Sequence, residues 1–207
     1  MTYRWQQGIY AITDATLMPS DRQLFEQVEA VLEGGIALLQ YRDKSRDDTH
    51  RYQQGKRLKQ LCDSHGVPLI INDDVALAEA LGAGVHLGQQ DGSLASARQR
   101  LGSHAIIGAT CHASLEHAAS ASHQGASYLA FGRFFASRTK PDAPPAPLSL
   151  LADAHRFKLP VVAIGGINAS NLNQVIDAGA DLAAVVHAVF GQPDPAMAVS
   201  RLNRLLR

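Results

Sequence analysis

Two aspartates, Asp73 and Asp91, have the residue type and the placement that chemistry with a metal ion requires. They lie in residues 69–74 and 84–91, and each of these segments is an apolar run that ends in polar groups. Apolar runs bounded by turn residues are typical of strands covered on both faces, and residues 75–81 between them have helical spacing. A strand–helix–strand unit makes its two strands parallel and brings their carboxyl ends to one side. We therefore expect the two carboxylates to approach each other.

A pair of carboxylates on one rim favours a hard cation. Mg²⁺ is usually held by only one or two carboxylates, and it keeps open positions for water and for phosphate oxygens. We predict that Asp73 and Asp91 bind Mg²⁺. The alternative is that the acids of this region cap helices, and we favour it for Asp74, which directly precedes the helical segment and can accept a backbone N–H.

The composition limits the classes of function. The chain has 207 residues, of which 46% are hydrophobic and 18% charged, as in soluble globular proteins, and we expect one domain over residues 1–207. Nineteen basic residues balance nineteen acidic ones, so no overall field favours a nucleic acid or an anionic membrane as partner. Any anionic ligand must be bound by local groups.

The cysteines and the first residues indicate a cytoplasmic protein. Cys62 and Cys111 fall in different expected elements and form no ligand-like pair, which argues against a disulfide framework or a zinc site. Residues 1–7 lack the apolar core of a secretory signal, and no apolar run approaches the length needed to cross a bilayer.

The positions of these groups depend on a repeated strand–helix pattern along the chain. Strands are expected at 8–13, 36–41, within 69–74 and 84–91, and at 106–110, 128–131, 160–164 and 182–186. Helices are expected at 21–32, 47–65, 75–81, 94–101, 114–124, 148–157, 170–178 and 194–205. Eight such alternations in a chain of this size predict an α/β fold, a compact (β/α)₈ TIM barrel. An open doubly wound sheet is the second candidate, although polar residues follow nearly every strand here rather than one switch point.

In a barrel the carboxyl ends of the strands form one face, where active sites lie. The candidate residues on that face are Gln40, Arg42, Lys44, Asn72, Asp73, Asp91, Thr110, His112, Ser137, Thr139, Lys140, Gly165, Gly166, Val186 and His187. Residues 132–147 form a long connection after the sixth strand whose prolines exclude a helix, and long loops in compact domains are usually functional.

This set contains two kinds of anion site. Arg42, Lys44 and Lys140 with a metal ion can hold a diphosphate through charge-assisted contacts. Gly165 and Gly166, with the turn after the eighth strand, can present backbone N–H groups to a phosphate. Two anion sites imply two phosphorylated ligands, or one ligand with phosphates at both ends. The alternatives are that the basic residues are solvated loop charges and that the glycines only turn the chain.

The histidines divide into three groups. Those on helices or helix ends are interpreted as surface residues, and they are His50, His65, His104, His117, His123 and His155. His86 is expected to pack at the rim rather than to bind a ligand. His112 and His187 stay open as substrate contacts.

Five motifs, in this order, resemble those of the thiamine phosphate synthase family of (β/α)₈ barrel enzymes. They are QYRDK at 40–44, INDD at 71–74, GVHLGQ at 84–89 with Asp91, SRTKP at 137–141 and AIGGI at 163–167. The resemblance covers essentially the whole chain. It implies an enzyme that joins 4-amino-2-methyl-5-hydroxymethylpyrimidine diphosphate to a thiazole phosphate, whether or not the thiazole carries a further carboxylate. The products would be thiamine phosphate and diphosphate.

The resemblance also implies a role for each candidate residue. Asp73 and Asp91 would hold Mg²⁺, and the catalytic groups that stabilise the leaving diphosphate would be Arg42, Lys44 and Lys140. The pyrimidine diphosphate would contact Gln40, Arg42, Lys44 and Asn72, with Thr110 and Lys140 at its diphosphate. The thiazole phosphate would contact Ser137, Thr139, Gly166, Val186 and His187. The chain departs from the commonest family pattern at Arg133, where a proline is usual, and at Thr110 and His187, where serines are usual.

Two other functions stay open. A thiazole tautomerase has the same barrel and uses a histidine that matches His112 to move a proton, but it needs no diphosphate centre. A non-catalytic regulator could bind a thiazole phosphate or thiamine phosphate, but the full set of acidic and basic groups would then have no role. The expected partners are small molecules, and apolar helix faces on the barrel exterior could serve a homodimer or only the core.

Overall fold

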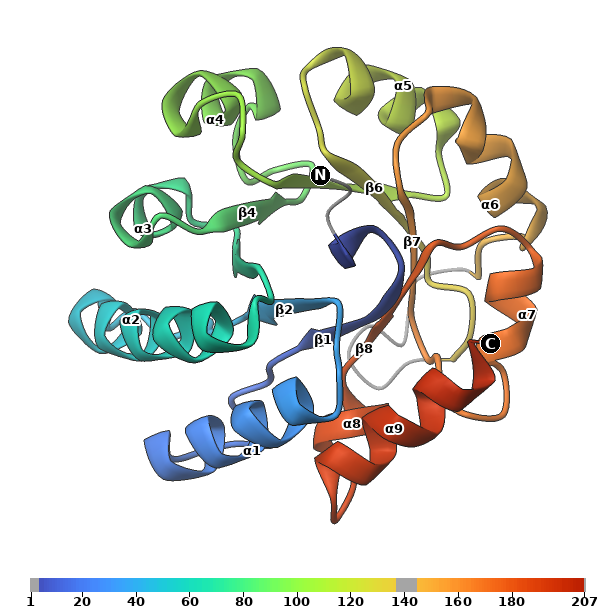
Figure 1. The fold of residues 1–207 in the computed structure, drawn as a ribbon. Coiled ribbons are helices and arrows are strands. Elements are labelled where there is room, and N and C mark those ends of the chain that lie inside the picture. Colours follow the sequence, from blue (N-terminus) through green and yellow to red (C-terminus); the bar gives the residue numbers. More distant parts are fainter. Residues whose placement is uncertain (1–3, 137–144, 207) are drawn as a thin grey trace.

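A computed structural model of the chain describes residues 4–136 and 145–206. Within these residues the strands pair in chain order, all parallel, and β1 pairs with β8 to close a barrel (Figure 1). The strands are β1 (Gly8–Ile12), β2 (Leu38–Tyr41), β3 (Leu69–Asn72), β4 (Gly84–Leu87), β5 (Ile107–His112), β6 (Tyr128–Phe131), β7 (Val161–Ile164) and β8 (Leu182–Val185). The predicted TIM barrel is confirmed, and the open doubly wound sheet is wrong.

The helices lie outside the barrel and cover its strands (Figure 1). They are α1 (Asp21–Glu33), α2 (Asp48–His65), α3 (Val75–Leu81), α4 (Leu94–Leu101), α5 (Leu115–His123), α6 (Ser149–Ala154), α7 (Leu172–Asp177), α8 (His187–Phe190) and α9 (Pro195–Leu205), with 3₁₀ turns η1 (Arg4–Gln6) and η2 (His155–Phe157). Side chains that accept a backbone N–H begin several of these helices, including Ser20 at α1, Asp74 at α3 and Ser114 at α5. The predicted cap Asp74 is thus confirmed.

Two expected helices are shorter in the structure, and one short helix is additional to those expected. The α-helix expected over 148–157 ends at Ala154 and continues as η2, and the helix expected over 170–178 is reduced to α7. The segment after β8 forms the short helix α8, which the sequence pattern does not predict. Four residues are too few to show helical periodicity.

Two apolar layers hold the barrel together. The larger layer lies between the sheet and the helices and includes the helix residues Val28, Leu58 and Leu151 with outward strand residues such as Ile71 and Val85. The smaller layer fills the barrel interior, and its members are Trp5, Tyr10, Ile12, Leu38, Ile70, Tyr128, Ala130, Val162, Leu182 and Ala184. Because both faces of every strand are covered, the strands read as continuous apolar runs.

Two glycines and a tryptophan determine how the interior is packed. A Cβ at Gly108 would lie 2.0 Å from the Tyr128 ring, so this position must be glycine for the ring to cross the barrel. A Cβ at Gly84 would lie 2.6 Å from the side chain of Ile70. Trp5 of η1 packs edge-on to Tyr128 with ring centroids 6.3 Å apart and closes the amino-terminal end of the barrel.

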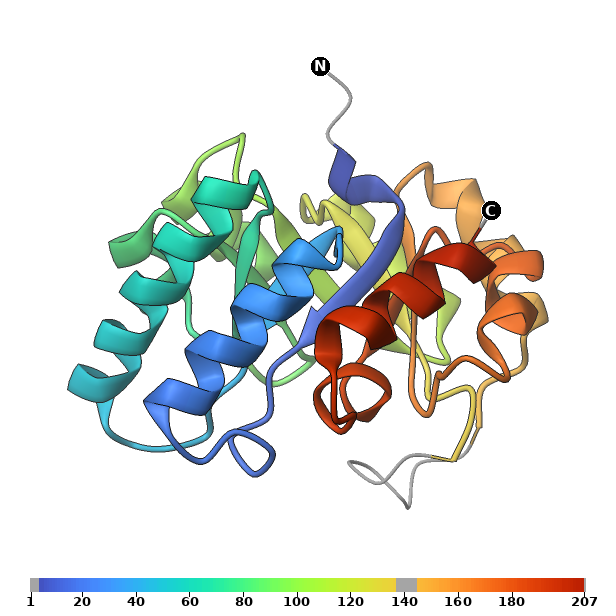
Figure 2. The ribbon, with the colours of Figure 1, turned by 60° about the horizontal axis from the view of Figure 1, so that its bottom comes forward.

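The loops that follow the strands gather at the opposite end from η1. In Figure 2, η1 lies at the upper end of the barrel and the loops that follow β1 and β2 lie at the lower end. Cys62 and Cys111 are both buried and unpaired. Within the described ranges, no helix combines the length and apolar character needed to span a membrane.

Candidate active site

The end of β3 positions Asp73 on the rim of the barrel. Its backbone N–H donates to the carbonyl of His86 on β4 at 2.8 Å, and its φ of 64° lies in the left-handed region. Non-glycine residues adopt this conformation uncommonly, and such residues cluster at functional sites. This backbone conformation ends β3, and the side chains of Asp73 and Asp74 point in different directions.

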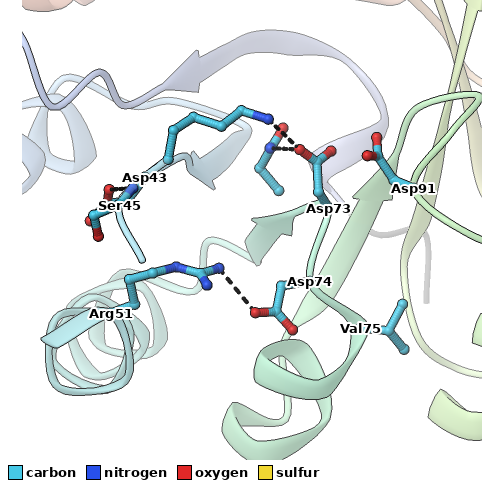
Figure 3. A pocket seen from close by; sticks show the side chains of 9 residues that line it. Asp43, Ser45, Arg51, Asp73, Asp74, Val75 and Asp91 are labelled. Atoms are coloured by element: carbon cyan, nitrogen blue, oxygen red, sulfur yellow. Dashed lines mark hydrogen bonds and ion pairs between the residues drawn. The ribbon is translucent and has the colours of Figure 1, made fainter. Parts of the chain in front are cut away.

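A turn after β4 positions Asp91. Its Oδ2 accepts the backbone N–H of Gly88 at 2.9 Å, and its own N–H donates back to the carbonyl of Gly88. A Cβ at Gly88 would lie 2.5 Å from Oδ2 of Asp91, so the glycine lets the carboxylate approach the backbone. Figure 3 shows the carboxylates of Asp73 and Asp91 pointing toward each other.

The charges around this pair differ for its two members. Nζ of Lys44 donates to Oδ2 of Asp73 at 2.7 Å, and Nδ2 of Asn72 donates to the same oxygen. Partial burial would raise the pKa of Asp73, but the hydrogen bonds from Lys44, Asp91 and Asn72 hold it below its ordinary value. Partial burial and the neighbouring Asp73 carboxylate raise the pKa of Asp91. Two close carboxylates resist joint ionisation, and a bound cation would relieve that repulsion.

These groups line a hollow that we call the rim pocket. It has a volume of about 470 Å³, and its lining residues are Asp43, Lys44, Ser45, Arg51, Asn72, Asp73, Asp74, Val75 and Asp91. The lining thus combines carboxylates with the cationic side chains of Lys44 and Arg51. A site of this kind can hold a cation and an anion side by side.

Asp74 lines the same pocket but has a structural role. Its Oδ1 accepts the backbone N–H of Leu77 as the N-cap of α3, and its Oδ2 accepts from Arg51 at 3.0 Å (Figure 3). Within residues 4–136 and 145–206, His, Cys, Asp and Glu side chains form no cluster of three or more that could hold a metal ion. A cation here would therefore have the Asp73 and Asp91 carboxylates and would keep open positions for water and ligand.

The loop after β1 adds an acidic residue that is not among the site residues predicted from the sequence. Burial would raise the pKa of Asp14, but hydrogen bonds from Thr16 and the nearby charges of Arg42 and His187 lower it. The backbone N–H of Arg42 donates to the hydroxyl of Thr13 at 2.9 Å, which ties the loop after β2 to that after β1. The signal that could have identified Asp14 is its place directly after the first strand.

Gln40 and Thr110 differ from the other candidate residues because their side chains form hydrogen bonds inside the barrel. Gln40 is buried and donates to the hydroxyl of Tyr10 at 2.7 Å. The hydroxyl of Thr110 lies 2.8 Å from Nε2 of His86. The His86 ring stacks on Tyr128, consistent with the expected packing role, and it also joins the hydroxyls of Thr110 and Tyr128. The sequence pattern does not reveal this polar interior.

The glycines after β7 allow two backbone segments to approach closely. Gly165 and Gly166 have φ of 104° and 69°, and a Cβ on Gly166 would lie 2.3 Å from the carbonyl oxygen of Ala136. Val186 and His187 lie where β8 passes into α8. His112 ends β5 with an exposed side chain. Ser137, Thr139 and Lys140 lie outside the described residues.

Comparison with known proteins identifies the family. The sequence model described as thiamine monophosphate synthase matches residues 9–189. The chain belongs to this family. It is 58% identical over 184 residues to the thiamine-phosphate synthase of Saccharophagus degradans, covering 88% of this chain and 85% of the relative. As a member of the thiamine monophosphate synthase family, the protein is an enzyme, a transferase of thiamine biosynthesis, as the motifs predict.

Two solved structures have a similar fold, and one of them is a thiamine phosphate pyrophosphorylase. The thiamine phosphate pyrophosphorylase from Pyrococcus furiosus superposes with a TM-score of 0.87 at 36% identity, covering 98% of this chain and 96% of that chain. A 3-hexulose-6-phosphate synthase superposes with a TM-score of 0.69 at 18% identity, covering 97% of this chain and 100% of that chain. The second likeness shows the barrel fold alone.

Proposed function

We propose that this member of the family joins 4-amino-2-methyl-5-hydroxymethylpyrimidine diphosphate to 4-methyl-5-(2-phosphooxyethyl)thiazole, or to its carboxylated form, and releases diphosphate. The observation that carries the proposal is the convergence of Asp73, Asp91 and Lys44 in the rim pocket. A pocket that serves a diphosphate needs both a place for a cation and a cationic side chain beside it.

The paired carboxylates fit Mg²⁺. Their hard oxygen atoms are the ligands that Mg²⁺ takes. Burial and the neighbouring Asp73 carboxylate raise the pKa of Asp91, and a bound cation would offset the repulsion between the two carboxylates. When bound, Mg²⁺ would act as a Lewis acid on the diphosphate oxygens, an effect of several kcal/mol on developing charge. Asp73 and Asp91 would hold it.

The basic side chains stabilise the leaving group. As the bond between the pyrimidine methylene carbon and the diphosphate oxygen breaks, negative charge grows on the diphosphate and positive charge on the aminopyrimidine. Lys44 and Arg42 follow β2 on this rim, and with Lys140 they would bind the developing negative charge. The thiazole nitrogen then bonds to the methylene carbon, so no side chain has to act as a nucleophile.

The remaining candidates bind the two substrates. Gln40 and Asn72 would contact the pyrimidine part, and Thr110 its diphosphate. Gly166, Val186 and His187, with Ser137 and Thr139, would hold the thiazole phosphate through backbone and side-chain donors. A cytoplasmic location and a homodimer stay predictions.

The test is to incubate purified protein with Mg²⁺ and each substrate alone or both together. The proposal predicts that diphosphate is released and that thiamine phosphate is found by mass spectrometry only when both substrates are present. Conversion of the thiazole phosphate to an isomer without diphosphate release would instead support a tautomerase. Tight binding of thiazole phosphate without any reaction would support a regulator.

A further inference from the structure

A continuous row of hydrogen-bonded side chains crosses the barrel interior and joins Gln40 to Thr110. Nε2 of Gln40 lies 2.7 Å from the Tyr10 hydroxyl, which lies 2.7 Å from the Tyr128 hydroxyl. The Tyr128 hydroxyl lies 2.9 Å from Nδ1 of His86, and Nε2 of His86 lies 2.8 Å from the Thr110 hydroxyl. We call these five residues the interior row. It connects side chains from β2, β1, β6, β4 and β5 in that order.

The burial of the interior row calls for an explanation. Gln40, Tyr10 and Tyr128 have relative exposures of 3%, 1% and 0%. Barrel interiors are usually filled by branched apolar side chains, and buried polar groups destabilise a core unless their hydrogen bonds are satisfied. Here Gly108 lacks a side chain so that the Tyr128 ring can reach across the barrel. The interior therefore contains polar groups and the space that they need.

The hydrogen bonds of the row share one direction. Burial raises the pKa of both Tyr10 and Tyr128 above their ordinary values, so each keeps one O–H proton. A phenol between two partners donates to one and accepts from the other. Since the amide of Gln40 donates to Tyr10, Tyr10 donates to Tyr128, and Tyr128 donates to Nδ1 of His86.

The same reasoning extends to the far end of the row. An imidazole that accepts at Nδ1 carries its proton at Nε2, so His86 donates to the oxygen of Thr110. The hydrogen bonds within the row then leave the hydroxyl proton of Thr110 and the amide oxygen of Gln40 unused. If the side-chain amide of Gln40 rotated by 180°, the donor and acceptor of every hydrogen bond in the row would exchange. Gln40 would then offer a donor to a ligand, and Thr110 would offer only an acceptor.

We propose that the interior row couples the two ends of the pyrimidine substrate, so that Gln40 accepts from its exocyclic amine when Thr110 donates to its diphosphate. This inference rests on the proposed function, because it uses that substrate. Tyr10, Tyr128 and His86 are positioning residues that act through Gln40 and Thr110.

The coupling has a consequence for specificity. A pyrimidine with an oxo group in place of the amine needs a donor from Gln40, which requires the reversed row. Thr110 would then donate to His86 and would present only lone pairs to the diphosphate. The intact row therefore disfavours the oxo compound at both ends, and a broken row would leave Gln40 and Thr110 independent.

The test compares kcat/KM for the amino substrate and its 4-oxo analogue in the wild type, Tyr10→Phe, Tyr128→Phe and the double variant. Phenylalanine keeps each ring and its packing and removes only the hydroxyl. Each single variant should lower the amino-to-oxo ratio about tenfold, mainly through a lower KM for the oxo compound, because one broken link frees the amide. The double variant should have the same ratio as either single variant, since one substitution already breaks the row.

Tyr41→Phe is the matched control. Tyr41 lies beside Gln40 on β2, is equally buried, and donates its hydroxyl to Gln54 on the helix side of the sheet. It should lose stability and keep the wild-type ratio. Wild-type ratios in Tyr10→Phe and Tyr128→Phe, with only a lower melting temperature as in Tyr41→Phe, would overturn the inference alone. A wild type that releases no diphosphate from the amino substrate would overturn the proposed function, and the inference with it.

Discussion

Nζ of Lys44 lies 2.7 Å from Oδ2 of Asp73, an ion pair that joins the loop after β2 to the end of β3. The Lys44 side chain is 61% exposed and that of Asp73 is 26% exposed. Ion pairs this exposed stabilise a fold by only about 0–1 kcal/mol. The pair is therefore better explained by the ligand that the pocket serves than by the stability of the barrel.

Replacing Lys44 by alanine should lower kcat for diphosphate release about 100-fold or more, because one preformed contact to developing negative charge is lost. The melting temperature should change by about 3 °C or less. Steady-state kinetics and a thermal melt check both numbers. Lys59→Ala, which breaks the helical pair of Lys59 with Asp63, should leave the kinetics unchanged. Equal activity in both variants would remove Lys44 from the proposed catalytic set.

Asp91→Asn should slightly stabilise the metal-free protein while it impairs the reaction. The pKa of Asp91 is raised by partial burial and by Asp73, so its charged form is disfavoured in the folded state. Removing that charge should raise the melting temperature without Mg²⁺ by at most about 3 °C at neutral pH. Asp177→Asn, at an exposed position on α7, serves as the control. A lower melting temperature specific to Asp91→Asn would show that its charge supports the fold.

Asp74→Ala should show the opposite pattern, with lost stability and a retained reaction. Asp74 caps α3 and pairs with Arg51, whose side chain is only 13% exposed. Losing the cap should cost about 0.5–2 kcal/mol, and the loss of one of the two ion pairs of Arg51, which keeps only its pair with Asp48, adds to this. Urea unfolding measures the loss, and kcat should stay within about threefold of wild type. Unchanged stability would mean that the cap and the ion pair contribute nothing measurable.

Gly108→Ala should destabilise the barrel from within, because the new Cβ would meet the Tyr128 ring. Forcing an extra carbon into a packed core costs about 1–3 kcal/mol, which corresponds to a fall in melting temperature of roughly 2–12 °C in a chain of this size. Differential scanning calorimetry provides the measurement. A wild-type melting temperature would show that the ring moves aside easily, and thus that the interior row is not rigidly held.

Cys62 and Cys111 should both be unreactive in the folded protein. Burial raises the pKa of each thiol to about 12, so almost no thiolate forms at neutral pH. An aromatic disulfide reagent should detect no thiol in the native protein and both thiols after denaturation. Rapid native labelling of either residue would contradict the buried placement of that thiol.

The sequence predicts the rim of the barrel better than its interior, for a physical reason. Asp73 and Asp91 could be paired from the sequence because parallel strands must end on the same side, and Asp74 could be assigned as a cap from its place before a helix. The sequence does not show whether Tyr10 and Tyr128 point into or out of the barrel, because strands covered on both faces have no alternation of polar and apolar residues.

Other features could not be predicted, because their sequence pattern is too short or because they form only in the closed barrel. Helix α8 has only four residues, so no periodicity marks it. Asp14 gains its meaning from Arg42 and His187, which approach it only when β1 lies between β2 and β8. His86 shows in sequence as one polar residue in an apolar strand, and its bonds to Tyr128 and Thr110 require the folded barrel.

The most direct test of the account is the Mg²⁺ dependence of diphosphate release by the wild type, Asp91→Asn and Asp74→Asn. Asp74→Asn removes a charge from the same pocket while asparagine can still cap α3. If Asp91 holds the cation, the wild type and Asp74→Asn should respond alike, and Asp91→Asn should need about ten times more Mg²⁺ or fail to respond. An Asp91→Asn variant with the wild-type Mg²⁺ dependence would contradict the proposed metal site.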